Sequence, residues 1–262
     1  MFKNLFNKKE EKPMEIPQDW VFYACKVDNN PASIRINLAL DKIAPIADYH
    51  HRTWFSVKLK DPDENGLPTN EEFPKICQIE DDIVDALTAK GAIMVGALKS
   101  NGTFDLYLYS KNTDRYDAIM GEVMAKNHSD YQFATDFKED AEWEDYFNFL
   151  YPNDYQYQSI QNRKVLFQLS KHEDNPEIER EIDHWLYFDS EANRENYIDE
   201  VQQIGYKVLS KDFRDDMPKN AYQLNISRVN STIDIDDYVW ELIEIAHKYN
   251  ADYDGWGCPI AK

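Results

Sequence analysis

Apolar and polar residues alternate along several stretches of the first half, which is the period-two pattern of strands with one buried face. Ile34 and Ile36, for example, flank the polar Arg35. Similar alternation, or a continuous β-prone run, predicts strands at 20–27, 34–40, 54–59, 92–99, 103–110 and 131–137. The first half therefore contains enough strand segments for a sheet.

Between these strands the apolar spacing becomes helical. A helix is expected over 71–90, with further helices over 112–127 and 142–150. The apolar stripe of the first helix consists of Ile76, Ile79, Ile83 and Leu87. Gly91 follows it, where a left-handed residue commonly ends a helix. Asn101-Gly102, between two strands, predicts a tight hairpin because both residues tolerate positive φ.

The second half has the same kind of pattern after a leading helix over 155–171. Strands are expected at 184–188, 206–212, 222–229 and 251–258, and helices at 190–204 and 234–249. Ser190 is a favourable N-cap, and Gly205 ends the same helix. The resulting order, β-α-β-β-α-β, specifies a ferredoxin-like unit with two helices on one face of an antiparallel sheet.

Residues 53–137 have this order as well, with an extra pair of strands before it. The expected fold class is therefore α+β: two tandem ferredoxin-like (β-α-β-β-α-β) sandwiches with antiparallel sheets, the first with extra N-terminal strands. We expect a flexible N-terminal tail over 1–15, a first domain over 16–152 and a second domain over 155–262. Pro152-Asn153-Asp154 marks the boundary, since these residue types favour turns.

Net charge narrows the class of binding partner, and cysteine usage narrows the cellular compartment. The 29 basic and 49 acidic side chains give a formal net charge of −20. Such a surface repels nucleic-acid backbones and anionic lipids and attracts basic proteins, so we expect no direct nucleic-acid or membrane partner. Cys25, Cys77 and Cys258 form no CxxC pair, which favours a cytoplasmic compartment over a disulfide framework. No apolar run approaches the roughly 20 residues that span a bilayer.

The sequence contains no P-loop, GxGxxG, GxSxG or HExxH motif, so we expect no catalytic residue, metal site or cofactor. His184 is expected to face the helices, partly buried. Two alternatives stay open. One is a calcium-binding or calcium-stabilised loop over 61–72, whose acidic spacing, Gly66 and Glu72 match an EF-hand loop, although Pro68 departs from it. The other is an uncharacterised enzyme in the first domain.

One face of the second domain is a candidate protein-binding surface. In the strand over 184–188, Leu186 and Phe188 are expected to face the helices. Because side chains alternate, Trp185 and Tyr187 are expected to point to the other face of the sheet. The last strand lies beside the first in this fold, which is expected to bring Tyr253 and Trp256 near Trp185. The candidate partner-binding residues are Asp183, Trp185, Tyr187, Asp189, Tyr253, Asp254 and Trp256.

Several segments of the second half resemble a known family. They are 162–166 (NRKVL), 182–188 (IDHWLYF), 204–206 (IGY) and 251–257 (ADYDGWG). On these residues, about 155–262 resembles the regulator of ribonuclease E activity B family. The resemblance implies a ferredoxin-like domain that binds an endoribonuclease and lowers RNA turnover without chemistry of its own. The acidic balance fits a partner with a basic surface.

The first half, about 16–152, resembles the domain of unknown function 695 family, which brings no known activity. The residues that carry this likeness are Asp19-Trp20, Gly66-Leu67-Pro68, Val95-Gly96, Trp143–Tyr146 and Leu150-Tyr151-Pro152. Members of the regulator family are usually standalone domains, so the fusion is a departure. We expect the protein to be a non-enzymatic regulator that binds another protein. The resemblance implies that it inhibits an endoribonuclease. The partner's identity and the oligomeric state stay open.

Overall fold

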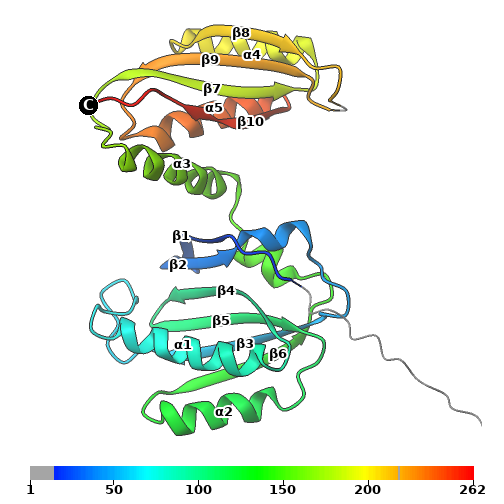
Figure 1. The fold of residues 1–262 in the computed structure, drawn as a ribbon, viewed down its shortest axis with the longest axis vertical. Coiled ribbons are helices and arrows are strands. Elements are labelled where there is room, and N and C mark those ends of the chain that lie inside the picture. The colour runs from blue at the N-terminus through cyan, green and yellow to red at the C-terminus, as the bar shows by residue number, and fades with distance from the viewer. Residues whose placement is uncertain (1–14, 218) are drawn as a thin grey trace, which may run out of the picture. The chain divides into compact units, whose positions relative to one another are not determined.

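The computed structural model of the protein describes residues 15–217 and 219–262. The expected tail over 1–15 lies outside these residues, apart from Glu15. The chain divides between Tyr151 and Pro152 into two compact units, each with one antiparallel sheet and its own helices (Figure 1). The α+β class is therefore confirmed.

The first unit is built on a six-stranded sheet in the order β1-β2-β4-β5-β3-β6. Its strands are β1 (Trp20–Val27), β2 (Asn30–Asn37), β3 (His51–Lys58), β4 (Ile93–Ser100), β5 (Thr103–Ser110) and β6 (Phe133–Glu139). The Asn101-Gly102 turn joins β4 to β5 with φ angles of 49° and 77°, as the sequence predicts. The strand predicted over 34–40 ends earlier because Leu38–Lys42 form a 3-10 helix, capped by the Asn37 side chain.

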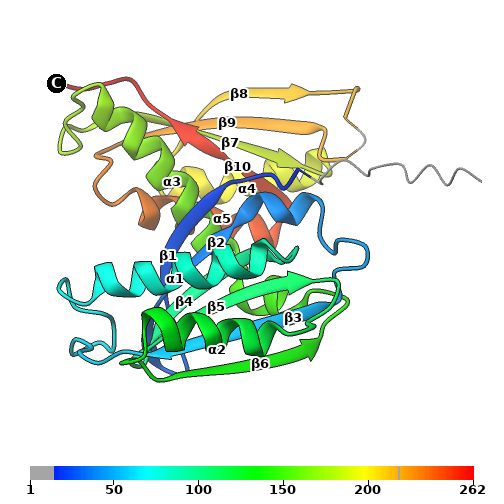
Figure 2. The same ribbon diagram turned by 60° about the horizontal axis from the view of Figure 1, so that its bottom comes forward.

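Two helices, α1 (Phe73–Thr88) and α2 (Tyr116–Asn127), cover one face of this sheet (Figure 2). The predicted apolar stripe of α1 is fully buried in a core that includes Phe55 of β3 and Leu106 of β5. Gly91 follows α1 with φ 91°, the left-handed conformation expected there. The helical periodicity of the sequence thus correctly predicts which side of α1 meets the sheet.

The other face of the first sheet is covered by the segment that follows β6. A short π-helix, Asp145–Leu150, stands where the sequence predicts a helix over 142–150. Trp143 stacks on Tyr109 of β5, with ring centroids 4.2 Å apart, and the Tyr23 hydroxyl donates to the Leu150 carbonyl at 2.8 Å. The first unit therefore has a third layer, which the expected two-layer sandwich does not include.

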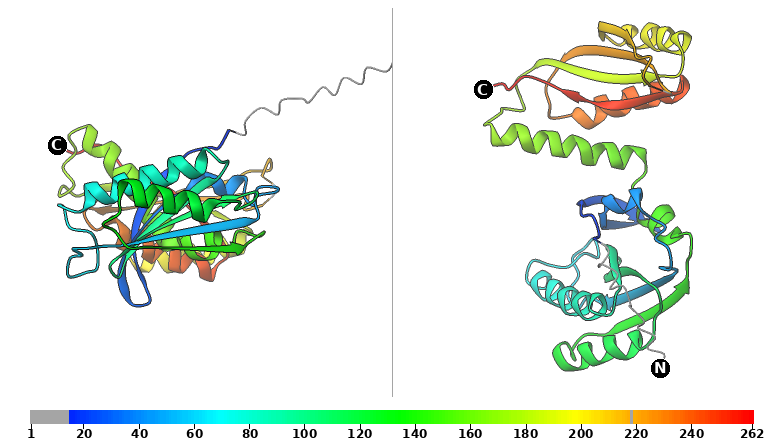
Figure 3. Two further views of the ribbon diagram at one scale, coloured as in Figure 1. Left: turned by 90° about the horizontal axis from the view of Figure 1, so that it is seen from below. Right: turned by 45° about the vertical axis from the view of Figure 1, so that its right-hand side comes forward.

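The second unit is built on a four-stranded antiparallel sheet in the order β10-β7-β9-β8. Its elements are α3 (Asp154–Lys171), β7 (Arg180–Phe188), α4 (Glu191–Gln203), β8 (Lys207–Phe213), β9 (Tyr222–Asn230), α5 (Ile235–Lys248) and β10 (Ala251–Gly257). Leu186 and Phe188 share one core with α4 and α5, so both helices cover the same face. α3 runs alongside α5 and contacts β10 (Figure 3). The element order after α3 is the predicted β-α-β-β-α-β.

Candidate protein-binding face of the second unit

The register of the second sheet decides which side chains share the face opposite α4 and α5, which we call the open face. Directly opposed residues of an antiparallel pair point to the same face, and Leu186 and Phe188 mark the helix-covered side. Three rows of residues cross the open face from β10 through β7 and β9 to β8. These rows are Asp252, Tyr187, Gln223 and Asp212; Gly255, Trp185, Asn225 and Ser210; and Gly257, Asp183, Ser227 and Lys207.

Trp185 is the largest side chain of the open face and is 38% exposed. Its indole lies over β10, because a Cβ placed on Gly257 would stand 3.4 Å from the ring atoms Cη2 and Cζ3. Gly255, the residue opposite Trp185, also has no side chain. The two glycines leave the space that the indole occupies. The segments 182–188 and 251–257, which carry the resemblance, thus build one feature together.

Carboxylates surround the two aromatic side chains. Tyr187 lies directly opposite Asp252, and Asp183 is the next outward residue of β7 beyond Trp185. Burial, with a contribution from the charge of Glu181, raises the pKa of Asp183. Lys207 is the one basic residue in the three rows. A cationic partner would relieve the repulsion between the acidic groups, so this face is electrostatically suited to a basic protein surface.

Tyr253 and Trp256 do not lie on the open face, which corrects the placement expected from the sequence. Tyr253 is opposite Leu186 on the helix-covered side. A bulge between Tyr253 and Gly255 then inserts one extra residue into β10 and puts Trp256 opposite His184. Because side chains alternate between faces, a one-residue shift moves Trp256 to the covered side. It is only 6% exposed there.

The buried residues of these segments hold the second unit together. Trp256 Nε1 donates to Oδ1 of Asn162 on α3 at 2.8 Å, and Asn162 Nδ2 donates to Asp236 at 2.6 Å. Nδ1 of His184 is 2.8 Å from the Tyr253 hydroxyl. Burial, reinforced by the Arg228 charge, lowers the pKa of His184 to about 3. The ring faces the helices as predicted, although it is more completely buried.

Asp189 and Asp254 occupy different settings at the ends of the motif. Asp189 follows β7, and its carboxylate accepts a 2.8 Å hydrogen bond from Asn193 Nδ2 at the start of α4. Asp254 is the exposed bulge residue of β10. With Trp185 and residues of α3 it lines a hollow of about 350 Å³. The structure therefore groups Asp183, Trp185 and Tyr187 on one face, places Asp254 at its rim and leaves Asp189 tied to α4.

Asp212, Asp252 and Gly257 are among the residues of the open face that were not predicted as candidate contact residues from the sequence. The two aspartates join the face through strand register, which the apolar pattern of polar, exposed strands does not specify. Gly257 does carry a signal, since a glycine inside a strand commonly marks a bulge or a close approach of another group. Here that group is the indole of Trp185.

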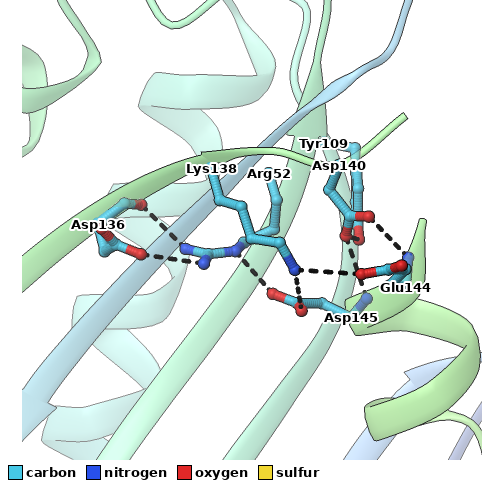
Figure 4. Close-up of polar contacts among 7 residues, drawn as sticks. All are labelled: Arg52, Tyr109, Asp136, Lys138, Asp140, Glu144 and Asp145. Atoms are coloured by element: carbon cyan, nitrogen blue, oxygen red, sulfur yellow. Dashed lines mark hydrogen bonds and ion pairs between the residues drawn. The ribbon is translucent and has the colours of Figure 1, made fainter. Parts of the chain in front are cut away.

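A polar cluster in the first unit joins β3 and β6 to the π-helix (Figure 4). The Arg52 guanidinium, almost fully buried, donates from Nη2 to Asp136 at 2.9 Å and from Nε to Asp145 at 2.7 Å. Lys138 Nζ donates to Asp145 at 3.0 Å. These contacts neutralise the buried charge and hold Asp145 against the sheet.

Asp140, in the same cluster, closes the turn that leads into the π-helix. Its carboxylate accepts a 2.5 Å hydrogen bond from Tyr109 and two more from the backbone N–H groups of Glu144 and Asp145. Burial would raise the pKa of Asp140, but these hydrogen bonds hold it below its ordinary value. The cluster has the character of a structural clamp, and it lends no support to an enzyme in the first unit.

The loop over 61–72 uses its acidic side chains internally. The Glu72 carboxylate accepts from the backbone N–H groups of Lys60 and Asp61 at 2.8 and 2.9 Å. Asp63 Oδ1 accepts from the N–H groups of Asn65 and Leu67 at 2.8 and 2.9 Å. Residues 15–217 and 219–262 contain no group of three or more histidine, cysteine, aspartate or glutamate side chains arranged to hold a metal ion. The geometry therefore gives no support to the calcium alternative.

In the part of the chain that the structure describes, every helix is too short or too polar to span a lipid bilayer. The fold and the open face define a class of protein: a two-unit α+β chain whose second unit presents aromatic residues among carboxylates. The chain belongs to the family of unknown function DUF695, whose family model matches residues 18–151. A second family model, Regulator of ribonuclease activity B, matches residues 159–258. Both resemblances stated from the sequence are confirmed.

No curated protein matches the chain. Among solved structures, an unknown protein from Galdieria sulphuraria is 9% identical and covers 80% of this chain and 99% of its own, with a TM-score of 0.24. A putative glycine cleavage system transcriptional repressor is 10% identical and covers 81% of this chain and 98% of its own, with a TM-score of 0.25. TM-scores this low carry no argument about fold or function.

Proposed function

We propose that the protein is a non-enzymatic regulator whose second unit binds an endoribonuclease and lowers RNA cleavage. One observation carries the proposal: the segments that resemble the matched regulator family lie side by side on β7 and β10 and present Trp185 among carboxylates. In this proposal the protein supplies a binding surface, and the ribonuclease supplies the chemistry.

The proposed contact surface consists of Asp183, Trp185, Tyr187 and Asp252, with Asp254 at its rim. Tryptophan and tyrosine commonly dominate the binding energy of an interface, because they bury a large area at low cost in conformational entropy. The surrounding carboxylates would speed association with a basic surface and orient it. Endoribonuclease segments that bind RNA are basic, so the charge of the open face suits such a partner.

We also propose that both units are ferredoxin-like sandwiches, over 16–152 and 155–262. The supporting observation is their shared strand pattern. From the last strand inward, the first unit has β6-β3-β5-β4 and the second has β10-β7-β9-β8, and all neighbouring strands are antiparallel. The first unit then adds β2 and β1 beyond β4.

Affinity capture with the full chain tests the proposed function. Wild type and Trp185→Ala would be incubated with nuclease-treated lysate of the source cell, and the endoribonuclease recovered would be quantified. Trp240→Ala is the matched control, because Trp240 lies on α5 and is 37% exposed, against 38% for Trp185. We expect wild type and Trp240→Ala to recover the endoribonuclease equally, and Trp185→Ala to recover at least about tenfold less, the loss of a strong interface residue.

Salt provides the second arm of this experiment. Raising the ionic strength from about 0.1 M to 1 M shortens the Debye length from about 10 Å to 3 Å, so recovery by wild type should fall steeply. Recovery of the endoribonuclease by Trp185→Ala at the wild-type level would show that the open face is not the contact surface. Absence of any endoribonuclease from the wild-type capture would contradict the proposed function itself.

A further inference from the structure

The first unit contains a small cavity between α1 and the strands that extend the sheet beyond β4. Its volume is about 240 Å³. The strand side is formed by Ser33, Arg35, Ala97, Lys99 and Phe104, with Phe22 at the edge. The helix side is formed by Phe73, Ile76, Cys77 and Glu80, whose spacing places them on one side of α1. The β1–β2 extension therefore creates a hollow that the other four strands and two helices would not enclose.

Strand register explains why the strand-side residues converge on this hollow. Ser33 lies opposite Lys99, and Lys99 lies opposite Phe104. Arg35 lies opposite Ala97 in the next row. Opposed residues share a face, so a hydroxyl, an ammonium and a guanidinium meet apolar walls on the α1 side of the sheet.

The charges in this cavity are not balanced. Arg35 is paired with Glu80. Lys99 has no ion-pair partner among the described residues; its Nζ lies over the ring of Phe73, 4.2 Å from the centroid, and 5.9 Å from that of Phe104. Burial, opposed by Cys77 and reinforced by Arg35, lowers the pKa of Lys99. One positive charge therefore remains in a partly dehydrated apolar site of a protein whose net charge is −20.

We propose that this cavity binds a small organic monocarboxylate with an aromatic or short aliphatic body. The carboxylate pairs with the Lys99 ammonium and reaches the Ser33 hydroxyl. The body lies against Phe73, Phe104 and Ile76. One unbalanced cation calls for a monoanion, and a charge-assisted hydrogen bond at a site with little water is stronger than the same bond at the surface. The volume equals that of about eight water molecules, which suits an anion the size of benzoate.

Protection of Cys77 from alkylation by iodoacetamide tests the proposal in the full chain, with benzoate as the probe. Cys77 lines the cavity. Cys25 belongs to the same unit but lies three residues after Phe22 on β1, and this odd separation points it to the opposite face of the strand. Cys258 belongs to the second unit. Peptide mass spectrometry would follow the three thiols separately. We expect millimolar benzoate to slow alkylation of Cys77 at least fivefold and to leave Cys25 and Cys258 unchanged.

Three controls test whether protection of Cys77 depends on the charge pairing between benzoate and Lys99. Benzyl alcohol, a neutral compound of the same shape, should give less than twofold protection. Lys99→Met keeps an unbranched side chain, one atom shorter, without the charge and should abolish protection by benzoate. Lys171→Met should retain it, because Lys171 also lies over a phenylalanine ring, 4.3 Å from the centroid of Phe167, but in the second unit.

If the Cys77 thiol reacts too slowly with iodoacetamide to be followed, NMR of Lys99 provides a second measurement of benzoate binding. The Lys99 amine, observed by NMR at its Cε, should show a higher pKa when benzoate is added, because a bound carboxylate favours the ammonium. Protection that is equal for all three cysteines, protection that survives in Lys99→Met, or a Lys99 amine that does not respond to benzoate would each overturn the proposal.

Discussion

The buried histidine of the second unit makes its stability depend on pH in a specific window. His184 is 1% exposed, with the rings of Tyr206 and Tyr253 beside it. Its pKa is about 3 in the folded protein, against about 6.5 in an unfolded chain. Between these values the unfolded state binds a proton that the folded state does not. Stability is therefore complete above pH ~6.5 and is lost progressively as the pH falls toward 3.

The size of the effect follows from the width of the window. Each pH unit inside it changes the free energy of unfolding by about 1.4 kcal/mol for one proton. Between pH 7.5 and pH 5.0 about 1.5 units lie inside the window, so His184 should account for a loss of about 2 kcal/mol. His184→Gln has no ring to protonate. Its stability should fall by about 2 kcal/mol less than that of wild type over the same interval.

Urea unfolding of the full chain at pH 7.5 and pH 5.0 measures this difference. Pulsed hydrogen exchange, followed in peptides from β7 and β10, would report the second unit separately from the first. His172 and His247 are present in both proteins, so their contributions cancel in the comparison. Equal losses of stability in wild type and His184→Gln, or a His184 ring that titrates near pH 6.5 by NMR, would refute the reasoning.

Three further changes test the packing of each unit. Arg52→Met deprives two partly exposed carboxylates of a buried partner and should lower the free energy of unfolding of the first unit by about 1.5–3 kcal/mol, measured by urea unfolding. Trp143→Ala removes a fully buried, stacked indole and should cost about 3–5 kcal/mol; calorimetry should show only the first unit's transition moving down. Gly257→Val places a side chain where the Trp185 indole lies, so the indole N–H resonance of Trp185 should shift while urea unfolding shows that the second unit remains folded.

Periodicity predicted the elements of this fold well because the strands and helices have consistent buried faces. The α1 stripe is an example: all four of its predicted apolar residues enter the core. Turn chemistry was equally informative, since Asn101, Gly91 and Gly205 all adopt the positive φ that their positions require. These signals are local, so a single sequence contains them.

The features that were not predicted depend on contacts between distant segments. Trp143 has φ 56°, a conformation that is uncommon for a bulky residue, and the stack on Tyr109 accompanies it. The bulge at Asp254 is similar: Gly255 beside it marks a possible bulge, but apolar alternation alone does not show which residue of β10 is skipped. For that reason Trp256 was assigned to the wrong face, whereas Trp185 and Tyr187 on β7 were assigned correctly. Tyr253 precedes the bulge and was misplaced because the sequence does not specify the register of β10 against β7.

The proposed regulator acts through the open face of its second unit, which should inhibit an endoribonuclease. The most direct measurement is the rate at which the purified endoribonuclease of the source cell cleaves RNA, as the full-length protein is added. Wild type and Trp240→Ala should lower the rate to the same extent, and Trp185→Ala should require at least about tenfold more protein for the same inhibition. An unchanged cleavage rate with saturating wild type, or equal inhibition by Trp185→Ala, would contradict the account.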